Sequence, residues 1–114
     1  MSHYADYMKE AFGEHVVEDE NGFYHYSFYD DYLFINNLYV SPSSRGFKVA
    51  KGYIRQMAKI AEIKKYKQLI GSVSLSNLKK ESVLTTYLRN KCKISSSNES
   101  FIYVSIKTED ALTL

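Results

Sequence analysis

One short segment combines residue types that could hold a phosphate group. Arg45-Gly46-Phe47-Lys48-Val49-Ala50 follows the small residues Ser43-Ser44 and opens the clearest amphipathic helix pattern in the chain. Free N–H groups at a helix N-terminus, together with the helix dipole, attract anions. The segment therefore predicts a seat for a phosphate or pyrophosphate between a strand and a helix.

Charge is unevenly distributed around this segment. Residues 45–67 carry eight basic side chains and one acidic one, a balance of +7, whereas residues 1–31 carry eight acids and one lysine, a balance of −7. Two interpretations follow. The two blocks attract one another, within the fold or across a homodimer, or the basic block binds a polyanion such as nucleic acid. The basic helix face expected to make that contact carries Lys48, Lys51, Arg55 and Lys59.

The first half of the chain predicts one helix and three strands. Apolar residues have helical spacing over 3–12, and strand patterns cover 14–17, 23–29 and 32–40. Asp30-Asp31 between the last two predicts an antiparallel hairpin. The polar pair Asn36-Asn37 interrupts the second strand of this hairpin and predicts a bulge there.

The second half alternates helices and strands. We expect helices over 46–66 and 78–89 and strands over 68–75 and 101–106. A strand–helix–strand run of this length predicts that the strands at 32–40 and 68–75 lie parallel. A turn is expected at 95–98, and the tail over 107–114 is expected to be frayed.

Length and composition favour one folded domain over residues 1–114. With 114 residues, of which 45% are apolar, the chain can form a single core. Cys92 is the only cysteine, so no intrachain disulfide can form, which favours a reducing, cytoplasmic location. No apolar run is long enough to cross a membrane, and the N-terminus lacks a secretory signal pattern.

The elements in this order resemble the GNAT superfamily of N-acetyltransferases. The resemblance rests on the strand end Leu38-Tyr39-Val40-Ser41-Pro42 and on residues 45–50, which match that family's (Gln or Arg)-x-x-Gly-x-(Gly or Ala) loop except at Lys48. It covers residues 23–106 and implies a GNAT-like α/β fold. That fold has a mixed sheet with antiparallel N-terminal strands, a central parallel strand–helix–strand unit, and helices on both faces. The N-terminal part is short relative to the family.

The resemblance also implies an activity, the transfer of an acetyl group from acetyl-CoA, as co-substrate, to an amine. The pantetheine arm would pair with the strand end, the pyrophosphate would bind the loop, and Tyr87 would protonate the departing thiolate. The residues implied to bind the co-substrate are Leu38, Tyr39, Val40, Arg45, Gly46, Phe47, Lys48, Val49, Ala50, Lys51 and Asn77.

The sequence leaves the acceptor and the general base open. The acceptor is a small-molecule amine or a protein lysine, and the candidates for the base are Glu14, His15, His25, Asp30 and Asp31. The spacing of His and Cys residues does not fit a metal site. The alternative function is an inactive binding module on the same fold, which contacts nucleic acid through the basic helix or a basic protein through the acidic first third.

Overall fold

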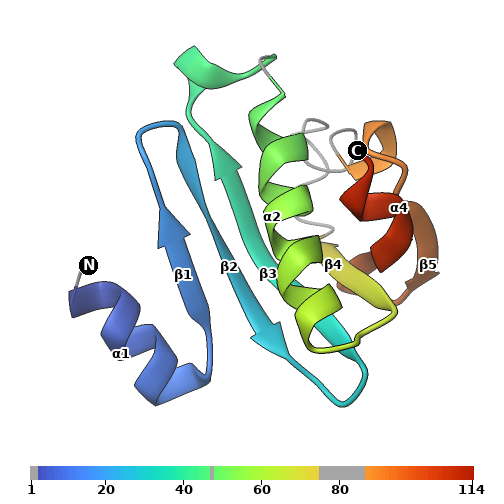
Figure 1. Ribbon diagram of the computed structural model, residues 1–114, viewed down its shortest axis with the longest axis horizontal. Helices are drawn as coiled ribbons and strands as arrows, with labels where there is room; N and C mark the ends of the chain where they lie inside the picture. Colours follow the sequence, from blue (N-terminus) through green and yellow to red (C-terminus); the bar gives the residue numbers. More distant parts are fainter. Residues whose placement is uncertain (1–2, 47, 75–86) are drawn as a thin grey trace.

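The computed structural model describes residues 3–46, 48–74 and 87–114, which form a six-stranded mixed sheet with helices packed on it (Figure 1). Along the sheet the strand order is β1-β2-β3-β4-β6-β5. The strands are β1 (His15–Glu18), β2 (Gly22–Phe28), β3 (Tyr32–Val40), β4 (Gln68–Ser74), β5 (Lys93–Ser97) and β6 (Phe101–Lys107). The helices are α1 (His3–Phe12), the short 3-10 helix η1 (Pro42–Ser44), α2 (Val49–Ile63) and α4 (Thr108–Leu112).

The sheet joins two antiparallel parts through one parallel pair. β1, β2 and β3 pair antiparallel, as do β4, β6 and β5. β3 and β4 pair parallel, with α2 as the connection between them. The sequence prediction of an antiparallel hairpin followed by a parallel strand–helix–strand unit is therefore confirmed.

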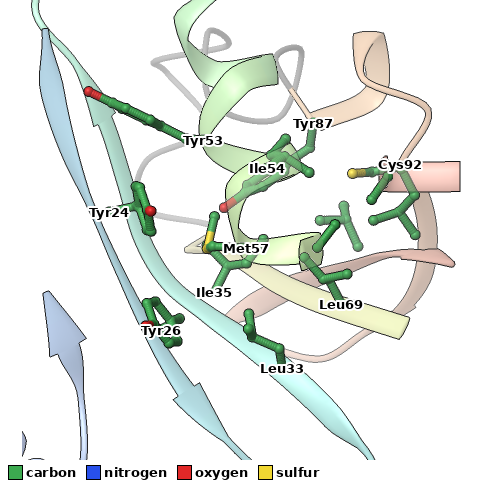
Figure 2. Close-up of a cluster of buried hydrophobic side chains, with 14 of the residues drawn as sticks. Tyr24, Tyr26, Leu33, Ile35, Tyr53, Ile54, Met57, Leu69, Tyr87 and Cys92 are labelled. Carbon is green, nitrogen blue, oxygen red and sulfur yellow. The ribbon is translucent and has the colours of Figure 1, made fainter. Parts of the chain in front are cut away.

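The core lies between the sheet and α2, where alternate residues of the strands meet the apolar face of the helix (Figure 2). Leu33 on β3 and Ile54 and Met57 on α2 are fully buried. Burial of each such side chain stabilises the fold by about 1.5–3 kcal/mol. α4 packs beside α2 on this face (Figure 1). α1 lies towards the other face, because its Tyr4 ring is 6.0 Å from the ring of His25, and His25 points to the opposite face of β2 from the buried Tyr24.

A bulge interrupts β3 where the sequence predicts one. Asn37 pairs with His25 and Ile35 pairs with Tyr26, so Asn36 is an extra residue that is skipped in the register, although its side chain donates to the Ser27 hydroxyl on β2. The insertion shifts the alternation of side chains by one residue. As a result Leu38, like Ile35, packs on the core side, which a regular strand would not allow.

Helix α2 is shorter at both ends than the expected span of 46–66. Gly46 and Lys48 have positive φ angles of 86° and 63°, which keep the preceding loop out of the helix. At the other end Lys65, with φ 63°, closes the helix. There the Tyr66 N–H bonds to the Ala61 carbonyl and the Lys65 N–H to the Glu62 carbonyl, which is a Schellman motif.

Two expectations for the C-terminal part are wrong. The segment expected to be a turn at 95–98 lies mostly in β5, an exposed edge strand whose serines carry no apolar alternation. The tail expected to be frayed forms α4, where Ala111 is fully buried, and Arg55 of α2 donates to the main-chain oxygen of Leu114. The expected helix at 78–89 lies outside the described residues except for 87–89, which are helical.

The two charge blocks are not joined by an ion pair anywhere in the described parts of the chain. Within 3–46, 48–74 and 87–114, the one close pair of opposite charge type joins His25 and Glu14, both in the N-terminal block. Across the same ranges, none of the helices has the length and apolar character needed to span a membrane.

Candidate functional site

The sheet opens between its two central strands. β3 and β4 pair only from Tyr32 opposite Gln68 to Ile35 opposite Gly71. Beyond this point β3 continues to Val40, paired on one side with β2, and β4 continues to Ser74, paired on one side with β6. The facing edges of the two strands are therefore unpaired with each other, and the bulge at Asn36 lies where they part.

Two residues present their main-chain groups on the open edge of β3. The Ser41 N–H bonds to the Asn21 carbonyl on the β2 side. Because main-chain groups alternate in direction along a strand, Tyr39 also faces β2, and Leu38 and Val40 face the opening. A side chain bonds to the main chain of each of these two residues. Asn37 Oδ1 accepts from the Leu38 N–H at 2.9 Å, and Arg45 Nε donates to the Val40 carbonyl at 3.0 Å.

The loop between β3 and α2 is held by hydrogen bonds to the turn between β1 and β2. The Ser44 hydroxyl donates to Asn21 Oδ1 at 3.0 Å and accepts from the Ser41 hydroxyl at 3.1 Å. After this anchored turn the chain passes through Gly46 to Lys48, both exposed. A Cβ at Gly46 would meet no atom within 4 Å, so it is the φ of +86°, not crowding, that favours glycine there.

Lys48 lies at the start of α2 in a left-handed conformation, with φ 63° and ψ 21°. It takes the place of a glycine in the loop pattern, and its backbone retains a conformation that glycine adopts easily. Val49 and Ala50 form the first turn of α2, and Lys51 follows on a half-exposed position. The N-terminus of α2 therefore stands at the mouth of the opening, with basic side chains beside it.

Tyr87 lies over the point where the strands separate. Its side chain reaches into the cluster between α2 and the sheet (Figure 2), and only 3% of it is exposed. A Cβ at Gly71 would stand 3.1 Å from Tyr87 Cζ and 3.2 Å from its hydroxyl oxygen. Gly71 is also the last residue of β4 that pairs with β3. The missing side chain of Gly71 thus makes room for the Tyr87 phenol next to the opening.

Burial keeps the Tyr87 phenol protonated. Desolvation, with a smaller effect of the nearby Cys92, raises the pKa of Tyr87 well above its usual value of 10. Burial likewise raises the pKa of the Cys92 thiol to about 12, so this buried cysteine is not a reactive thiolate at neutral pH. A phenol that retains its proton can donate a hydrogen bond and cannot act as a base, and its raised pKa makes it a weaker acid than an exposed tyrosine.

Among the candidates for a general base, the structure brings Glu14 and His25 together. His25 Nδ1 lies 3.4 Å from Glu14 Oε1, and His25 is paired across the sheet with Asn37 beside the bulge. His15 is separate, since it stacks on the Tyr26 ring with 5.0 Å between centroids. Burial, with Lys9 and Lys64 nearby, lowers the pKa of His15. Asp30 and Asp31 lie in the hairpin turn.

The structure thus gathers most of the sequence-predicted residues around one opening. Leu38, Tyr39 and Val40 form one edge, and Arg45, Gly46 and Lys48 to Lys51 form its mouth. Phe47 and Asn77 lie outside the described residues.

Sequence reasoning missed the contacts that Asn37 and Gly71 make. The asparagine pair signalled the bulge but not the side-chain contact, and Gly71 is a glycine inside a strand pattern, which is the usual sign of a close approach.

Several solved structures with a similar fold are acetyltransferases. A PaiA N-acetyltransferase from Thermoplasma acidophilum in complex with coenzyme A aligns with a TM-score of 0.67 and 20% identity over 76% of this chain and 53% of that protein. Nourseothricin acetyltransferase aligns with a TM-score of 0.66 and 17% identity over 77% and 58%. A GNAT family acetyltransferase from Elizabethkingia anophelis with acetyl-CoA bound aligns with a TM-score of 0.63 and 15% identity over 78% and 69%.

These similarities concern the fold. No protein-family model and no curated protein sequence matches the chain. The chain spans 53% and 58% of the length of the first two solved structures. The mixed sheet, its antiparallel N-terminal strands and the parallel β3–α2–β4 unit are those that the resemblance of the sequence implies. The chain therefore has the fold of the GNAT N-acetyltransferases.

Proposed function

We propose that this protein is an acetyl-CoA-dependent N-acetyltransferase. The observation that carries the proposal is the end of β3–β4 pairing at Ile35 and Gly71, which leaves two facing strand edges. An extended chain with amide groups can pair with such an edge. The pantetheine arm of acetyl-CoA is a chain of this kind, and the solved structures with coenzyme A or acetyl-CoA bound share the fold.

The loop and α2 supply what the charged end of the co-substrate requires. A pyrophosphate at residues 45–50 would meet the N–H groups at the α2 N-terminus and the positive end of the helix dipole. Lys48 and Lys51 add positive charge at the same place. The loop is preorganised, because Ser44 and Ser41 tie it to the β1–β2 turn through Asn21.

Tyr87 would provide the proton that the reaction consumes at sulfur. When the amine nitrogen bonds to the thioester carbonyl carbon and the carbon–sulfur bond breaks, the sulfur leaves as a thiolate. The protonated Tyr87 hydroxyl lies beside Gly71, where the strands part, and would donate its proton to that thiolate. Water takes the proton that the amine nitrogen loses and returns one to the Tyr87 oxygen, so that the products are the amide and the CoA thiol. The acceptor would be a small-molecule amine or a protein lysine.

The test is calorimetric titration of the protein with acetyl-CoA and CoA, with ATP as a control for general phosphate affinity. We expect saturable binding of both acetyl-CoA and CoA and much weaker binding of ATP. Gly46→Glu should abolish the binding, because it strains a residue with φ +86° and places a negative charge in the pyrophosphate seat.

Gly13→Glu is the matched control. Gly13 also has a positive φ, of 66°, with open space around it, but it ends α1 far along the sheet from the loop. The variant suffers the same strain and gains the same charge, and it should bind as the wild type does. Equal affinities of the Gly46 and Gly13 variants would contradict the site. Absence of CoA binding, with nucleic-acid binding that weakens steeply with salt, would favour the binding-module alternative instead.

A further inference from the structure

The edge of β3 that would bind the co-substrate is already hydrogen-bonded to the chain's own side chains. The Leu38 N–H donates to Asn37 Oδ1, and the Val40 carbonyl accepts from Arg45 Nε. In a continuous sheet both groups would bond to a neighbouring strand. The two side chains therefore stand where a strand-like ligand would place its own acceptor and donor.

Both side chains can leave these positions without disturbing the core. Asn37 and Arg45 are exposed, and neither belongs to the buried cluster between α2 and the sheet. The Arg45 guanidinium also lies 5.8 Å from the centre of the Tyr39 ring, on the same strand end. Exposed hydrogen bonds and a weak ring contact hold the two side chains on the edge, so a ligand with better partners can displace them.

We propose that the Asn37 and Arg45 side chains compete with the ligand for the open edge of β3, and that the pantetheine arm of CoA binds by displacing them. This inference rests on the proposed function. Pantetheine carries two amide groups, which offer the carbonyl acceptor that Leu38 needs and the N–H donor that Val40 needs. Once displaced, the Arg45 guanidinium remains next to the loop and can pair with a phosphate of the same ligand.

CoA must break the hydrogen bonds that Asn37 and Arg45 make before it can bind the β3 edge. The affinity for CoA is therefore lowered by the net contribution of these bonds. A single intramolecular hydrogen bond contributes a net stabilisation equivalent to about a two- to tenfold change in an equilibrium constant. Removal of the Asn37 amide should therefore tighten CoA binding by about two- to tenfold. A side chain that contacted the ligand directly would have the opposite effect when removed.

The experiment is calorimetric titration of wild type, Asn37→Ala and Asn98→Ala with CoA. Asn98 is the matched control, because its Oδ1 likewise accepts main-chain N–H groups, those of Ser100 and Phe101, in the turn between β5 and β6. We expect tighter binding by Asn37→Ala and no change in Asn98→Ala. Unchanged or weaker binding by Asn37→Ala, with the wild type binding normally, would overturn the inference and leave the proposed function standing.

A second, independent test compares the affinity of Arg45→Ala for two ligands, pantetheine and CoA. With pantetheine, which has no phosphate, the variant should bind more tightly than the wild type, because the Val40 carbonyl is released. With CoA it should bind more weakly, because the phosphates lose a cation. Weaker binding of both ligands would contradict the competition. If neither the wild type nor any variant binds CoA or pantetheine, the proposed function and this inference both fail.

Discussion

Lys48 shows how a residue can depart from a sequence pattern while its backbone follows it. The loop pattern calls for glycine at this position, and the sequence alone presents lysine as a deviation. In the structure Lys48 has φ 63° and ψ 21°, the left-handed conformation that glycine adopts without strain. The pattern identifies this position as one for glycine, whereas the left-handed conformation and its strain are seen only in the dihedral angles.

Lys48→Gly should stabilise the protein. A non-glycine residue in the left-handed region costs about 1–2 kcal/mol, and part of the gain is offset by the greater freedom of glycine in the unfolded chain. We expect the free energy of unfolding in urea to rise by about 0.5–1 kcal/mol. Lys48→Ala retains the strain and serves as the control. An equal gain in both variants would mean that the lysine charge, and not its backbone, is responsible.

At the level of elements, the sequence predicted best where apolar residues recur at a regular spacing over most of an element. The spans of α1 and β3 agree with the expected ones: α1 has helical apolar spacing although none of its residues is buried, and β3 alternates on either side of its bulge. β5 was missed because its residues are all exposed and its serines have no apolar alternation, so its pairing with the following strand β6 leaves no pattern in the sequence. α4 was missed because five residues are too few for a helical period, and packing against α2 stabilises it.

The contact between β4 and Tyr87 allows a sharp test at Gly71. An added Cβ would stand 3.1 Å from the Tyr87 ring, which is itself buried and cannot move freely. Gly71→Ala should therefore lower the free energy of unfolding by about 1–3 kcal/mol.

Gly52→Ala is the paired control for that experiment. Gly52 lies in the first half of α2, and a Cβ there would meet no atom within 4 Å. Alanine should therefore raise the free energy of unfolding by about 0.5–1 kcal/mol, because glycine is a poor helix former. A Gly71→Ala variant as stable as the wild type would show that the Tyr87 ring does not rest on β4.

At the level of the whole molecule, a hydrogen bond links the two charge blocks that the sequence presented as −7 and +7. The Tyr53 hydroxyl on α2 donates to Asp19 Oδ1 in the β1–β2 turn at 2.6 Å. The same carboxylate accepts the N–H groups of Asn21 and Gly22. Composition left two interpretations open, attraction between the blocks or binding of a polyanion by the basic block, and it could not indicate that a neutral phenol contacts the acidic block.

The hydrogen bond between Tyr53 and Asp19 makes the free energy of unfolding depend on pH. The bond from Tyr53, and to a lesser degree the two N–H groups, hold the pKa of Asp19 below its usual value of 3.8. A carboxyl with a lowered pKa in the folded state stabilises the fold above its unfolded pKa, and this contribution is lost as the pH falls through the folded value. We expect the free energy of unfolding to decline below about pH 4, and Tyr53→Phe to weaken that decline.

Urea denaturation at a series of pH values from neutral to 2 measures this effect. Asp19→Asn is the control, because an amide oxygen still accepts from Tyr53 but does not titrate in this range. Its profile should be flatter than that of the wild type, like the profile of Tyr53→Phe. Three parallel profiles would mean that other carboxyl groups determine the acid sensitivity.

The partial pairing of the central strands also has a mechanical consequence. Four residues of β3, Tyr32 to Ile35, form the seam that joins a ribbon of β1, β2 and β3 to a ribbon of β4, β6 and β5. The first described residues form α1, which precedes the first ribbon, and the last ones form α4 and the residues after it, which follow the second ribbon. A force pulling the two ends apart would therefore load this seam and the α2 connection. A chain that bound in the proposed position would bridge both ribbons and brace them, so we expect the protein to resist stretching more strongly with CoA added than without it.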